Sequence, residues 1–393
     1  MANARKTGNG LARVLYVAAL DPRSKFGSME EQIFILARSF KEHGGLFLPF
    51  FACPLGPEFA ATFERERLQV AWADLGRFRP ATLRTLLALI HQQRIEIVHW
   101  NFYHPFNPYV WALSLTCPRL KHYLTDHNSR TTEVGDSIPR SLSPAPIRRL
   151  IKRSLARRYS KVLCISDYVL RCVQHDGVWR RMSRCDHFIN TERFRPDPSV
   201  HGRIRRELEA GDRFVVLVVA HLIPEKGTHV ALKALSRLND RTVLWVVGGG
   251  PESAPLQALC RELALDNRVR FLGCQRDVSQ YMQAADCLVV PSLWQEAVGL
   301  TVLEGLACGL PVVASDVGGI PEFVKDGNTG FLFRAGDDRL LADIVQAIQT
   351  NPQAHHDMRL RAREEAVRRF SPDARLSDYF TLYQRPGIRS NPT

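Results

Sequence analysis

The sequence predicts an α/β protein with two Rossmann-like domains, each built around a parallel β-sheet. Its 393 residues are more than one ordinary domain needs and suit two. Short apolar runs typical of buried strands alternate with amphipathic helical stretches along most of the chain. Loops that contain glycine or polar residues follow several of these runs, as in doubly wound sheets.

The first strand–loop–helix unit lies near the start of the chain. Residues 13–20 (RVLYVAAL) are apolar and predict a buried strand. Ser28 and Glu31 have the spacing of a capping box, which predicts that a helix begins here, just after Gly27. Gly44 follows the last apolar position and can end that helix. Further elements are predicted as strands at 46–54 and around Val70, with a helix over 80–94.

An unusually aromatic and polar loop follows the strand predicted at Ile95–His99. It contains Trp100, Asn101, Phe102, Tyr103 and His104. Loops at the carboxyl ends of strands form the binding sites of open α/β sheets, so we interpret this segment as a binding loop. The next strand, at 122–125, is followed by Asp126, His127 and Asn128.

The positive charge of the chain lies in its first half. Residues 1–200 contain 30 Lys and Arg against 17 Asp and Glu, whereas residues 201–393 contain 23 of each. Ile147–Lys161 predicts an amphipathic helix with six basic side chains before Lys161, followed by a strand from Lys161 and a helix capped by Ser166. The asymmetry indicates an anionic partner, either a membrane surface or an acidic acceptor, although a packed helix with a solvated charged face explains the pattern equally well. Nucleic-acid recognition motifs are absent from the sequence, so we expect no nucleic-acid partner.

The cysteines and the apolar runs indicate a protein of a reducing compartment. Nine cysteines are scattered without a CxxC pair, which supports neither a disulfide framework nor a zinc site. No apolar run approaches the length that spans a bilayer. The first 20 residues superficially resemble a signal peptide, but Asp21 and Pro22 follow at once, and we favour a first core strand.

The second half repeats the strand–loop–helix pattern. Residues 214–220 predict a strand whose loop ends in Pro-Glu-Lys-Gly at Gly227. Gly248–Gly250 follows the next strand but lacks the GK[ST] ending of a phosphate loop, so we interpret it as a turn that lets another segment approach. Two short strands around a helix follow, in residues 269–290.

Two acidic residues and a glycine stand out in residues 291–323. Glu296 and Glu304 are eight positions apart, and Gly299 lies between them. We expect Glu296 in a loop and Glu304 on the first turns of a helix that Gly299 opens. The free N–H groups of that helix end suit a phosphate, so the two carboxylates should face neutral hydroxyls instead.

This stretch resembles the donor-site signature of the family 4 glycosyltransferases (glycosyl transferases group 1), in which a Glu, seven residues and a second Glu precede a Gly-x-Pro-Val-Val strand. Glu296, Glu304 and 309–313 match it, and Val298 replaces the usual aromatic residue. The resemblance implies the retaining GT-B fold, in which two Rossmann-like domains face each other across a cleft. It implies an acceptor-binding domain at 1–197, a nucleotide-sugar-binding domain at 198–375 and a segment crossing back to the first domain at 376–393.

The loop before residue 228 resembles a second element of this family, Gly-Arg-Leu-x-x-x-Lys-Gly. Leu222, Lys226 and Gly227 match, but His221 stands at the arginine position. Lys226 is therefore the best candidate for neutralising the leaving diphosphate, and His221 cannot replace a guanidinium unless it is protonated.

The resemblance implies further roles, residue by residue. Glu304 would hold the ribose hydroxyls and Glu296 the sugar hydroxyls, while His127 would reach the donor sugar unless it is only a capping or hydrogen-bonding residue of its loop. Phe194 and Pro196 match the family's linker element, in which His187, Phe188 and Asn190 replace Asn, Gly and Asp. The predicted catalytic residues are Lys226, Glu296 and His127, and the predicted donor-binding residues are Gly27, His221, Gln275, Arg276, Val298, Gly299, Leu300, Thr301 and Glu304.

The function implied is a retaining hexosyltransferase that moves a sugar from a nucleotide-diphosphate donor to an acceptor hydroxyl, in cell-envelope polysaccharide or glycolipid synthesis. We expect a UDP- or GDP-linked sugar as co-substrate, no further cofactor and, without an Asp-x-Asp motif, no metal. The acceptor would be lipid-linked or a glycan and would bind the aromatic loop after His99. We expect a cytoplasmic protein, with peripheral binding at the inner face of the membrane as a hypothesis. The alternatives are a GT-B nucleotide-sugar epimerase and a non-catalytic nucleotide-sugar-binding protein.

Overall fold

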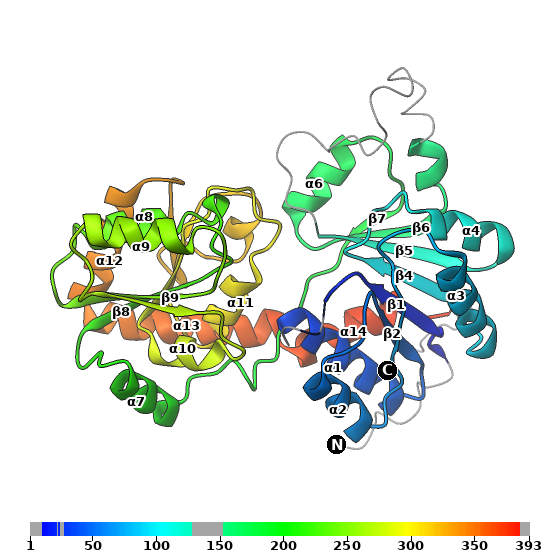
Figure 1. Ribbon diagram of the computed structural model, residues 1–393, viewed down its shortest axis with the longest axis horizontal. Coiled ribbons are helices and arrows are strands. Elements are labelled where there is room, and N and C mark those ends of the chain that lie inside the picture. The colour runs from blue at the N-terminus through cyan, green and yellow to red at the C-terminus, as the bar shows by residue number, and fades with distance from the viewer. Residues whose placement is uncertain (1–9, 22, 24–26, 128–151, 386–393) are drawn as a thin grey trace. The chain divides into compact units, whose positions relative to one another are not determined.

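The computed structural model describes residues 10–21, 23, 27–127 and 152–385, which form two compact units (Figure 1). The N-terminal unit contains the described residues up to His187 together with those from Arg375 onward. The C-terminal unit contains Phe188–Ala374. The chain thus enters the C-terminal unit ahead of the boundary predicted after residue 197, and it returns at Arg375.

The N-terminal unit is built on a seven-stranded parallel sheet with the order β3-β2-β1-β4-β5-β6-β7. Buried apolar side chains fill β1 and β2 at every position, as expected of strands covered on both faces. The strands are β1 (Val14–Ala18), β2 (Phe47–Phe51), β3 (Ala71–Trp72), β4 (Ile97–Asn101), β5 (Lys121–Asp126), β6 (Tyr159–Cys164) and β7 (Met182–Arg184).

Helices connect these strands, and their ends follow local chemistry. The first helix, α1 (Ser28–Glu42), has Gly27 as its N-cap, and the Glu30 carboxylate accepts a hydrogen bond from the Gly27 N–H at 3.0 Å. The predicted Ser28–Glu31 capping box is therefore wrong by one residue, because Gly27 is the last residue with extended backbone. The Ser166 hydroxyl caps α6 as predicted, accepting from the Val169 N–H at 3.2 Å. The other helices are α2 (Pro57–Arg65), α3 (Pro80–Gln92), α4 (Pro108–Thr116) and α6 (Asp167–His175).

Two sequence predictions for this unit are corrected by the structure. Trp100 and Asn101 belong to β4 and are fully buried, because the strand runs two residues further than the pattern of Ile95–His99 suggested. The basic segment is helical over residues 152–156, but β6 already begins at Tyr159, so the predicted helix to Lys161 is too long. The first residues of that predicted helix, and Asn128, lie outside the described part of the chain.

The C-terminal unit is built on a six-stranded parallel sheet with the order β10-β9-β8-β11-β12-β13. Helices α8, α9 and α12 cover one face of this sheet, and α10 and α13 lie on the other face (Figure 1). The strands are β8 (Phe214–Val219), β9 (Thr242–Val247), β10 (Val269–Gly273), β11 (Cys287–Val290), β12 (Val312–Ser315) and β13 (Gly330–Phe333). The helices are α7 (Pro198–Glu207), α8 (Thr228–Leu235), α9 (Ser253–Glu262), α10 (Ser279–Ala284), α11 (Leu300–Ala307), α12 (Asp338–Thr350) and α13 (Pro352–Phe370), with short 3-10 turns η2 (Pro224–Lys226) and η3 (Ile320–Glu322).

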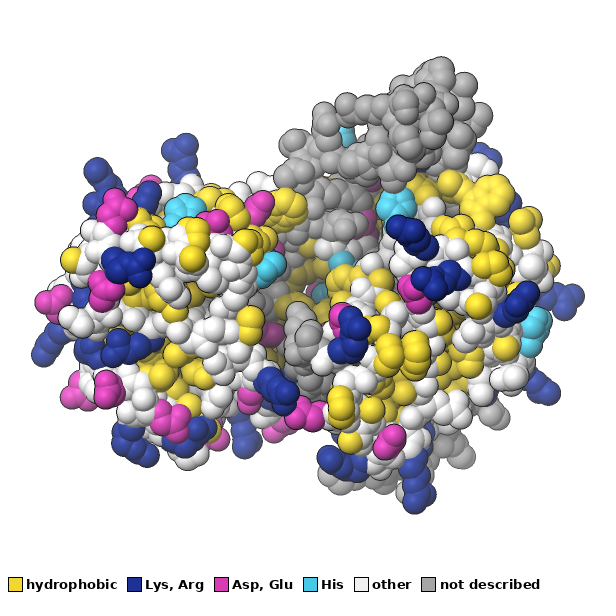
Figure 2. All heavy atoms as spheres, viewed as in Figure 1, with side chains coloured by type: hydrophobic (Ala, Val, Ile, Leu, Met, Phe, Trp, Pro, Cys, Tyr) yellow, Lys and Arg dark blue, Asp and Glu magenta, His cyan; other side chains and the backbone are white. Residues whose placement is uncertain are grey.

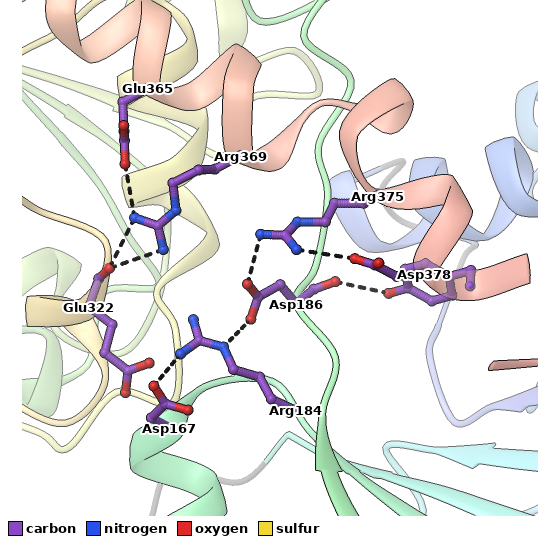
Figure 3. Close-up of polar contacts among 9 residues, drawn as sticks. Asp167, Arg184, Asp186, Glu322, Glu365, Arg369, Arg375 and Asp378 are labelled. Atoms are coloured by element: carbon purple, nitrogen blue, oxygen red, sulfur yellow. Dashed lines mark hydrogen bonds and ion pairs between the residues drawn. The ribbon is translucent and has the colours of Figure 1, made fainter. Parts of the chain in front are cut away.

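The last helix, α14 (Pro372–Leu382), packs its later turns into the N-terminal unit. Arg375 pairs with Asp186 at 3.0 Å, and Asp186 also pairs with Arg184 (Figure 3). Tyr383 is fully buried, and its carbonyl accepts from the Ala12 N–H at 2.8 Å. The C-terminal segment is therefore part of the core of the N-terminal unit.

A separate ionic cluster stabilises the end of α13 within the C-terminal unit. Arg369 donates to the Glu365 carboxylate at 3.1 Å and to the Glu322 carbonyl (Figure 3). Arg368 and Lys325 pair with the same carboxylate, and these cations hold the pKa of Glu365 at about 2 although burial opposes this.

Candidate active site

The strand order of the C-terminal unit places two loops side by side. The sheet order reverses at β8 and β11, which are neighbours although two strands separate them in sequence. In open parallel sheets ligands bind at the carboxyl ends of the strands on either side of such a switch point. The loop after β8 carries Lys226, and the loop after β11 carries Glu296.

Lys226 and Glu296 form an ion pair across these loops. The Lys226 ammonium donates to Oε1 of Glu296, and the Ser292 hydroxyl donates to the same oxygen at 2.8 Å. The Glu296 residue is buried, with 7% of its surface exposed, whereas the Lys226 side chain retains 30%. The two residues predicted to handle the donor are thus brought into contact, with the lysine reachable from solvent.

Two glycines permit the close approach of the backbones around this pair. Gly227 has φ +64, and a Cβ there would lie 2.0 Å from the Pro291 carbonyl oxygen. Gly318 has φ +59, and a Cβ there would lie 2.1 Å from the Glu296 carbonyl oxygen. That same oxygen accepts a hydrogen bond from the Gly319 N–H at 2.7 Å. Any side chain at either position would push the loops apart.

The N-cap of helix α11 lies three residues after Glu296, at Gly299, as the sequence predicted. Gly299 is its N-cap in the left-handed conformation, with φ +73. Leu300 and Thr301 form the first turn and are half-buried, and Glu304 on the second turn is 8% exposed. The N–H groups of this first turn carry partial positive charge suited to an anion.

Val298 lies between the glutamate and the helix, and its side chain is 3% exposed. Its side chain therefore packs in the interior of the unit. The predicted contact of Val298 with a donor stays a prediction.

The remaining predicted donor residues of this unit lie at the same edge of the sheet. His221 lies two residues after the end of β8 and is exposed, and its ring packs against Gly250. Gln275 and Arg276 follow β10, the edge strand beyond β9. Gln275 donates its amide N–H to the Leu272 carbonyl at 2.5 Å, which orients that loop. Because all six strands are parallel, these loops leave the sheet on one side.

The other two predicted residues, Gly27 and His127, belong to the N-terminal unit. Gly27 begins α1 after the β1 loop, and His127 follows the last residue of β5. The His127 Nε2 lies 3.2 Å from Oδ1 of Asn101 on β4. His127 thus hydrogen-bonds a side chain of the neighbouring strand, as the alternative weighed from the sequence expects, and its contact with a donor sugar stays a prediction.

The electrostatics of His127 are set mainly by burial. Burial lowers the pKa of His127 well below its ordinary value of 6.5, and the nearby His187 and His99 lower it further. The imidazole is therefore neutral at pH 7. Such a ring can accept or donate a hydrogen bond but carries no charge for a phosphate.

Neither a cluster of metal ligands nor a membrane-spanning helix is found among the described residues. Among them, no group of three His, Cys, Asp or Glu side chains is placed to hold a metal ion. Within the same residues, none of the helices combines the length and apolar character that a membrane span requires.

Sequence reasoning did not identify several residues that support the site. Ser292 holds Glu296, and Gln295 accepts a hydrogen bond from the Gly318 N–H at 2.7 Å. In the N-terminal unit His187 stacks on His127. Only the proximity of Ser292 and Gln295 to Glu296 in the sequence could have suggested the first two, because their partners depend on the folded loops.

Two family models match the chain. The model described as "Glycosyltransferase Family 4" matches residues 30–193, and the model "Glycosyl transferases group 1" matches residues 202–365. Together they cover most of the chain, one for each half.

Curated relatives carry related names. The N-acetyl-alpha-D-glucosaminyl L-malate synthase of Bacillus anthracis is 36% identical over 140 residues, which cover 36% of each chain. The GDP-mannose-dependent alpha-(1-6)-phosphatidylinositol monomannoside mannosyltransferase of Mycolicibacterium smegmatis is 30% identical over 237 residues, 57% of this chain and 62% of the relative. The matched segments thus span from about a third to under two thirds of these relatives.

Solved structures share the fold over nearly the whole chain. Anabaena HepE, in complex with UDP and glucose, has a TM-score of 0.77 at 22% identity, covering 94% of this chain and 99% of its own. A glycosyltransferase from Rickettsia africae has a TM-score of 0.79 at 18% identity, covering 95% and 98%. Two parallel Rossmann-like sheets, the paired loops at Lys226 and Glu296, and a family model for each half agree: the chain belongs to the family 4 (group 1) glycosyltransferases and has their GT-B fold.

Proposed function

We propose that this protein transfers a hexose from a nucleotide-diphosphate donor to an acceptor hydroxyl with retention at the anomeric carbon. The observation that carries the proposal is the Lys226–Glu296 pair at the β8–β11 switch point, in which Glu296 lies three residues before Gly299, the N-cap of α11. A cation and a helix N-terminus can bind the diphosphate of a sugar nucleotide, and a buried carboxylate can accept hydrogen bonds from its sugar hydroxyls. UDP- and GDP-linked sugars are the proposed donors, with no additional cofactor.

The geometry supports an exchange of partners at Lys226 when the donor binds. In the free protein the Lys226 ammonium is held by the Glu296 carboxylate. A diphosphate carries more charge than one carboxylate and can take over the lysine, which leaves Glu296 to accept hydrogen bonds from sugar hydroxyls. Glu304 would hold the ribose hydroxyls from the second turn of α11.

The chemical step then depends on stabilising the leaving group. The bond between the anomeric carbon and the phosphate oxygen breaks with its electron pair on the diphosphate, while the acceptor oxygen bonds to that carbon and gives its proton to an oxygen of the departing diphosphate. Lys226 and the first N–H groups of α11 would stabilise the negative charge that builds on the diphosphate. One such pre-oriented donor is worth about 3–4 kcal/mol in comparable sites.

The proposed acceptor is a lipid-linked or glycan hydroxyl of the cell envelope, bound by the N-terminal unit at the inner face of the membrane. Relatives named for phosphatidylinositol mannoside and lipopolysaccharide core synthesis support this class. The Arg158 guanidinium lies 5.8 Å from the ring centre of Trp111, which is 43% exposed, and such pairs suit a lipid interface. Figure 2 shows Lys and Arg side chains distributed over the visible faces of both units.

The test is release of nucleoside diphosphate from a panel of UDP- and GDP-sugars, with and without envelope lipid extract. We expect release from one donor that depends on acceptor, and a product whose anomeric configuration by NMR matches the donor. Conversion of the donor without acceptor would indicate the epimerase, and binding without turnover would indicate a binding protein. Equal partitioning onto neutral and anionic vesicles would refute membrane association separately.

A further inference from the structure

The loop that carries Glu296 is held by the turn that follows β12 in the same unit. The Gly319 N–H donates to the Glu296 carbonyl at 2.7 Å, and the Gly318 N–H donates to the side-chain oxygen of Gln295 at 2.7 Å. A Cβ on Gly318 would lie 2.1 Å from the Glu296 carbonyl oxygen and 2.6 Å from the Glu296 nitrogen. We call residues 318–322 the η3 turn. Its backbone is in direct contact with that of Glu296, so a shift of the η3 turn displaces Glu296 as well.

The far end of the η3 turn is bound by Arg369 on α13. Nη1 and Nη2 of Arg369 each lie 3.4 Å from the carbonyl oxygen of Glu322, and Nη1 also donates to Oε1 of Glu365 at 3.1 Å (Figure 3). Within the turn, the Glu322 N–H donates to the Gly319 carbonyl at 3.0 Å. A path of hydrogen bonds therefore runs from Arg369 through Glu322 and Gly319 to Glu296.

Packing around Arg369 fixes the start of this path. The Arg369 guanidinium lies over the ring of Phe370, 4.7 Å from its centre, and its side chain is 21% exposed. The rings of Phe370 and Phe323, both buried, are 5.6 Å apart and attach α13 to the residue after the η3 turn. Lys325 adds an ion pair to Glu365 at 2.9 Å. Arg369 is thus oriented by its neighbours before it bonds the Glu322 carbonyl.

Arg368 provides a natural comparison on the same helix. It pairs with the same Glu365 carboxylate at 2.5 Å, but its side chain is 61% exposed. Among the described residues it hydrogen-bonds only that carboxylate, whereas Arg369 bonds both the carboxylate and the η3 turn. Loss of either arginine leaves Glu365 with two cations, so neither change strands a buried charge.

We infer that Arg369 is a positioning residue for sugar transfer, which holds the η3 turn against the Glu296 loop and thereby sets the place of the Glu296 carboxylate. This inference rests on the proposed function, because it concerns how Glu296 is held for that reaction. Lys226 and the first N–H groups of α11, the proposed partners of the diphosphate, lie outside the path. A change at Arg369 should therefore affect transfer more than diphosphate binding.

The first test follows the Gly319 amide in the ¹H–¹⁵N NMR spectrum of full-length protein labelled at glycine, with Gly319→Ala used for assignment. We expect its signal to move and its hydrogen exchange to quicken roughly tenfold in Arg369→Gln, because the turn loses its far anchor. Arg368→Gln should leave both unchanged. A Gly319 signal that is the same in Arg369→Gln and the wild type would overturn the inference.

The second test compares kinetic and binding constants of the same variants. A misplacement of about 1 Å can cost roughly 100-fold in rate, and we expect Arg369→Gln to lower kcat roughly three- to tenfold. The donor KM and the Kd of the nucleoside diphosphate should stay within about twofold, and Arg368→Gln should match the wild type throughout. Arg369→Lys keeps a cation for Glu365 but lacks the planar fork that bonds two partners at once, so it should show the same loss without a loss of folding.

A double-mutant cycle separates positioning from a general loss of stability. In Glu296→Ala no carboxylate is left to position, so adding Arg369→Gln should lower kcat by less than about twofold further. An equal fold-loss in the wild-type and Glu296→Ala backgrounds would overturn the inference, because a general structural effect acts in both.

The outcomes distinguish this inference from the proposed function. Transfer that continues with unchanged kcat in both Arg369 variants would refute the positioning role and leave the proposed function standing. Absence of transfer by the wild type from every donor would refute the proposed function, and the Gly319 signal would still decide whether Arg369 holds the η3 turn against the Glu296 loop.

Discussion

Acid should destabilise the N-terminal unit, because histidines buried there cannot accept protons in the folded state. Burial lowers the pKa of His99 to about 3 and the pKa values of His122 and His187 to about 4. In the unfolded chain each has a pKa near 6.5. Unfolding therefore takes up protons below about pH 6.5, and stability falls as the pH falls from there toward the folded pKa values.

The magnitude follows from these values. At pH 5, about 1.5 pH units below the unfolded pKa, each of the three histidines costs about 2 kcal/mol, and together they cost about 6 kcal/mol. Domains are typically stable by 5–15 kcal/mol, so this loss is comparable with the whole stability of the unit. The Glu365 pKa of about 2 shows that a buried carboxylate of the C-terminal unit stays ionised at pH 5 and loses nothing there.

Urea unfolding between pH 7.5 and pH 5, followed by tryptophan fluorescence, measures this loss. The slope of the free energy of unfolding against pH gives the protons taken up, which should be at least three near pH 5, because His127, whose pKa burial also lowers, adds to the three histidines above. His122→Gln should lower that number by about one, because it removes one of the buried imidazoles, while the exposed His91→Gln should leave it unchanged. A free energy of unfolding that stays constant from pH 7.5 to pH 5 would refute the reasoning.

Three further predictions concern single contacts. Gly318→Ala should destabilise the C-terminal unit by more than the roughly 1–2 kcal/mol of left-handed strain, whereas Gly327→Ala, at φ +68 with nothing within 4 Å, should cost the strain alone; urea unfolding compares them. Glu296→Gln should keep or tighten diphosphate binding by releasing Lys226 but lower sugar transfer roughly 10- to 100-fold, measured by calorimetry and turnover. Tyr383→Phe removes the hydroxyl that contacts His99 and should cost about 1–3 kcal/mol of unfolding free energy at pH 7.5.

Each of these predictions has a result that contradicts it. Equal losses in the two glycine variants would mean that the Glu296 loop yields to a methyl group. Weaker diphosphate binding in Glu296→Gln would mean that the carboxylate assists the anion instead of competing for Lys226. An unchanged stability of Tyr383→Phe would mean that water replaces its hydroxyl beside His99.

The sequence predicted the fold and the C-terminal loops well, because both depend on local patterns. Apolar runs of strand length identified most strands of both sheets, although β7 and β13 were not predicted, and Gly299 identified the start of α11. The ion pair between Glu296 and Lys226 could not be predicted from their positions in the sequence. It forms because β8 and β11, the strands that precede their loops, are neighbours in the sheet.

The parts that were missed depend on packing between distant segments. Trp100 was placed in a binding loop because aromatic residues suit loops at strand ends, yet it completes β4 in the core. The stack of His127 on His187 joins the end of β5 to the segment after β7, and no hydrophobic pattern in the sequence predicts a contact between these two segments. The consequence of His221 at the arginine position stays a prediction, since its ring lies exposed beside Gly250.

Binding of UDP, GDP and ADP by calorimetry tests the central claim most directly, namely that the loops at Lys226 and α11 hold a nucleoside diphosphate. We predict that one nucleotide binds the wild type and that Lys226→Ala and Glu304→Ala each weaken it roughly 10- to 100-fold. The exposed control Lys233→Ala on α8 should bind it like the wild type. Failure of all three nucleotides to bind, or unchanged binding in both site variants, would contradict the account.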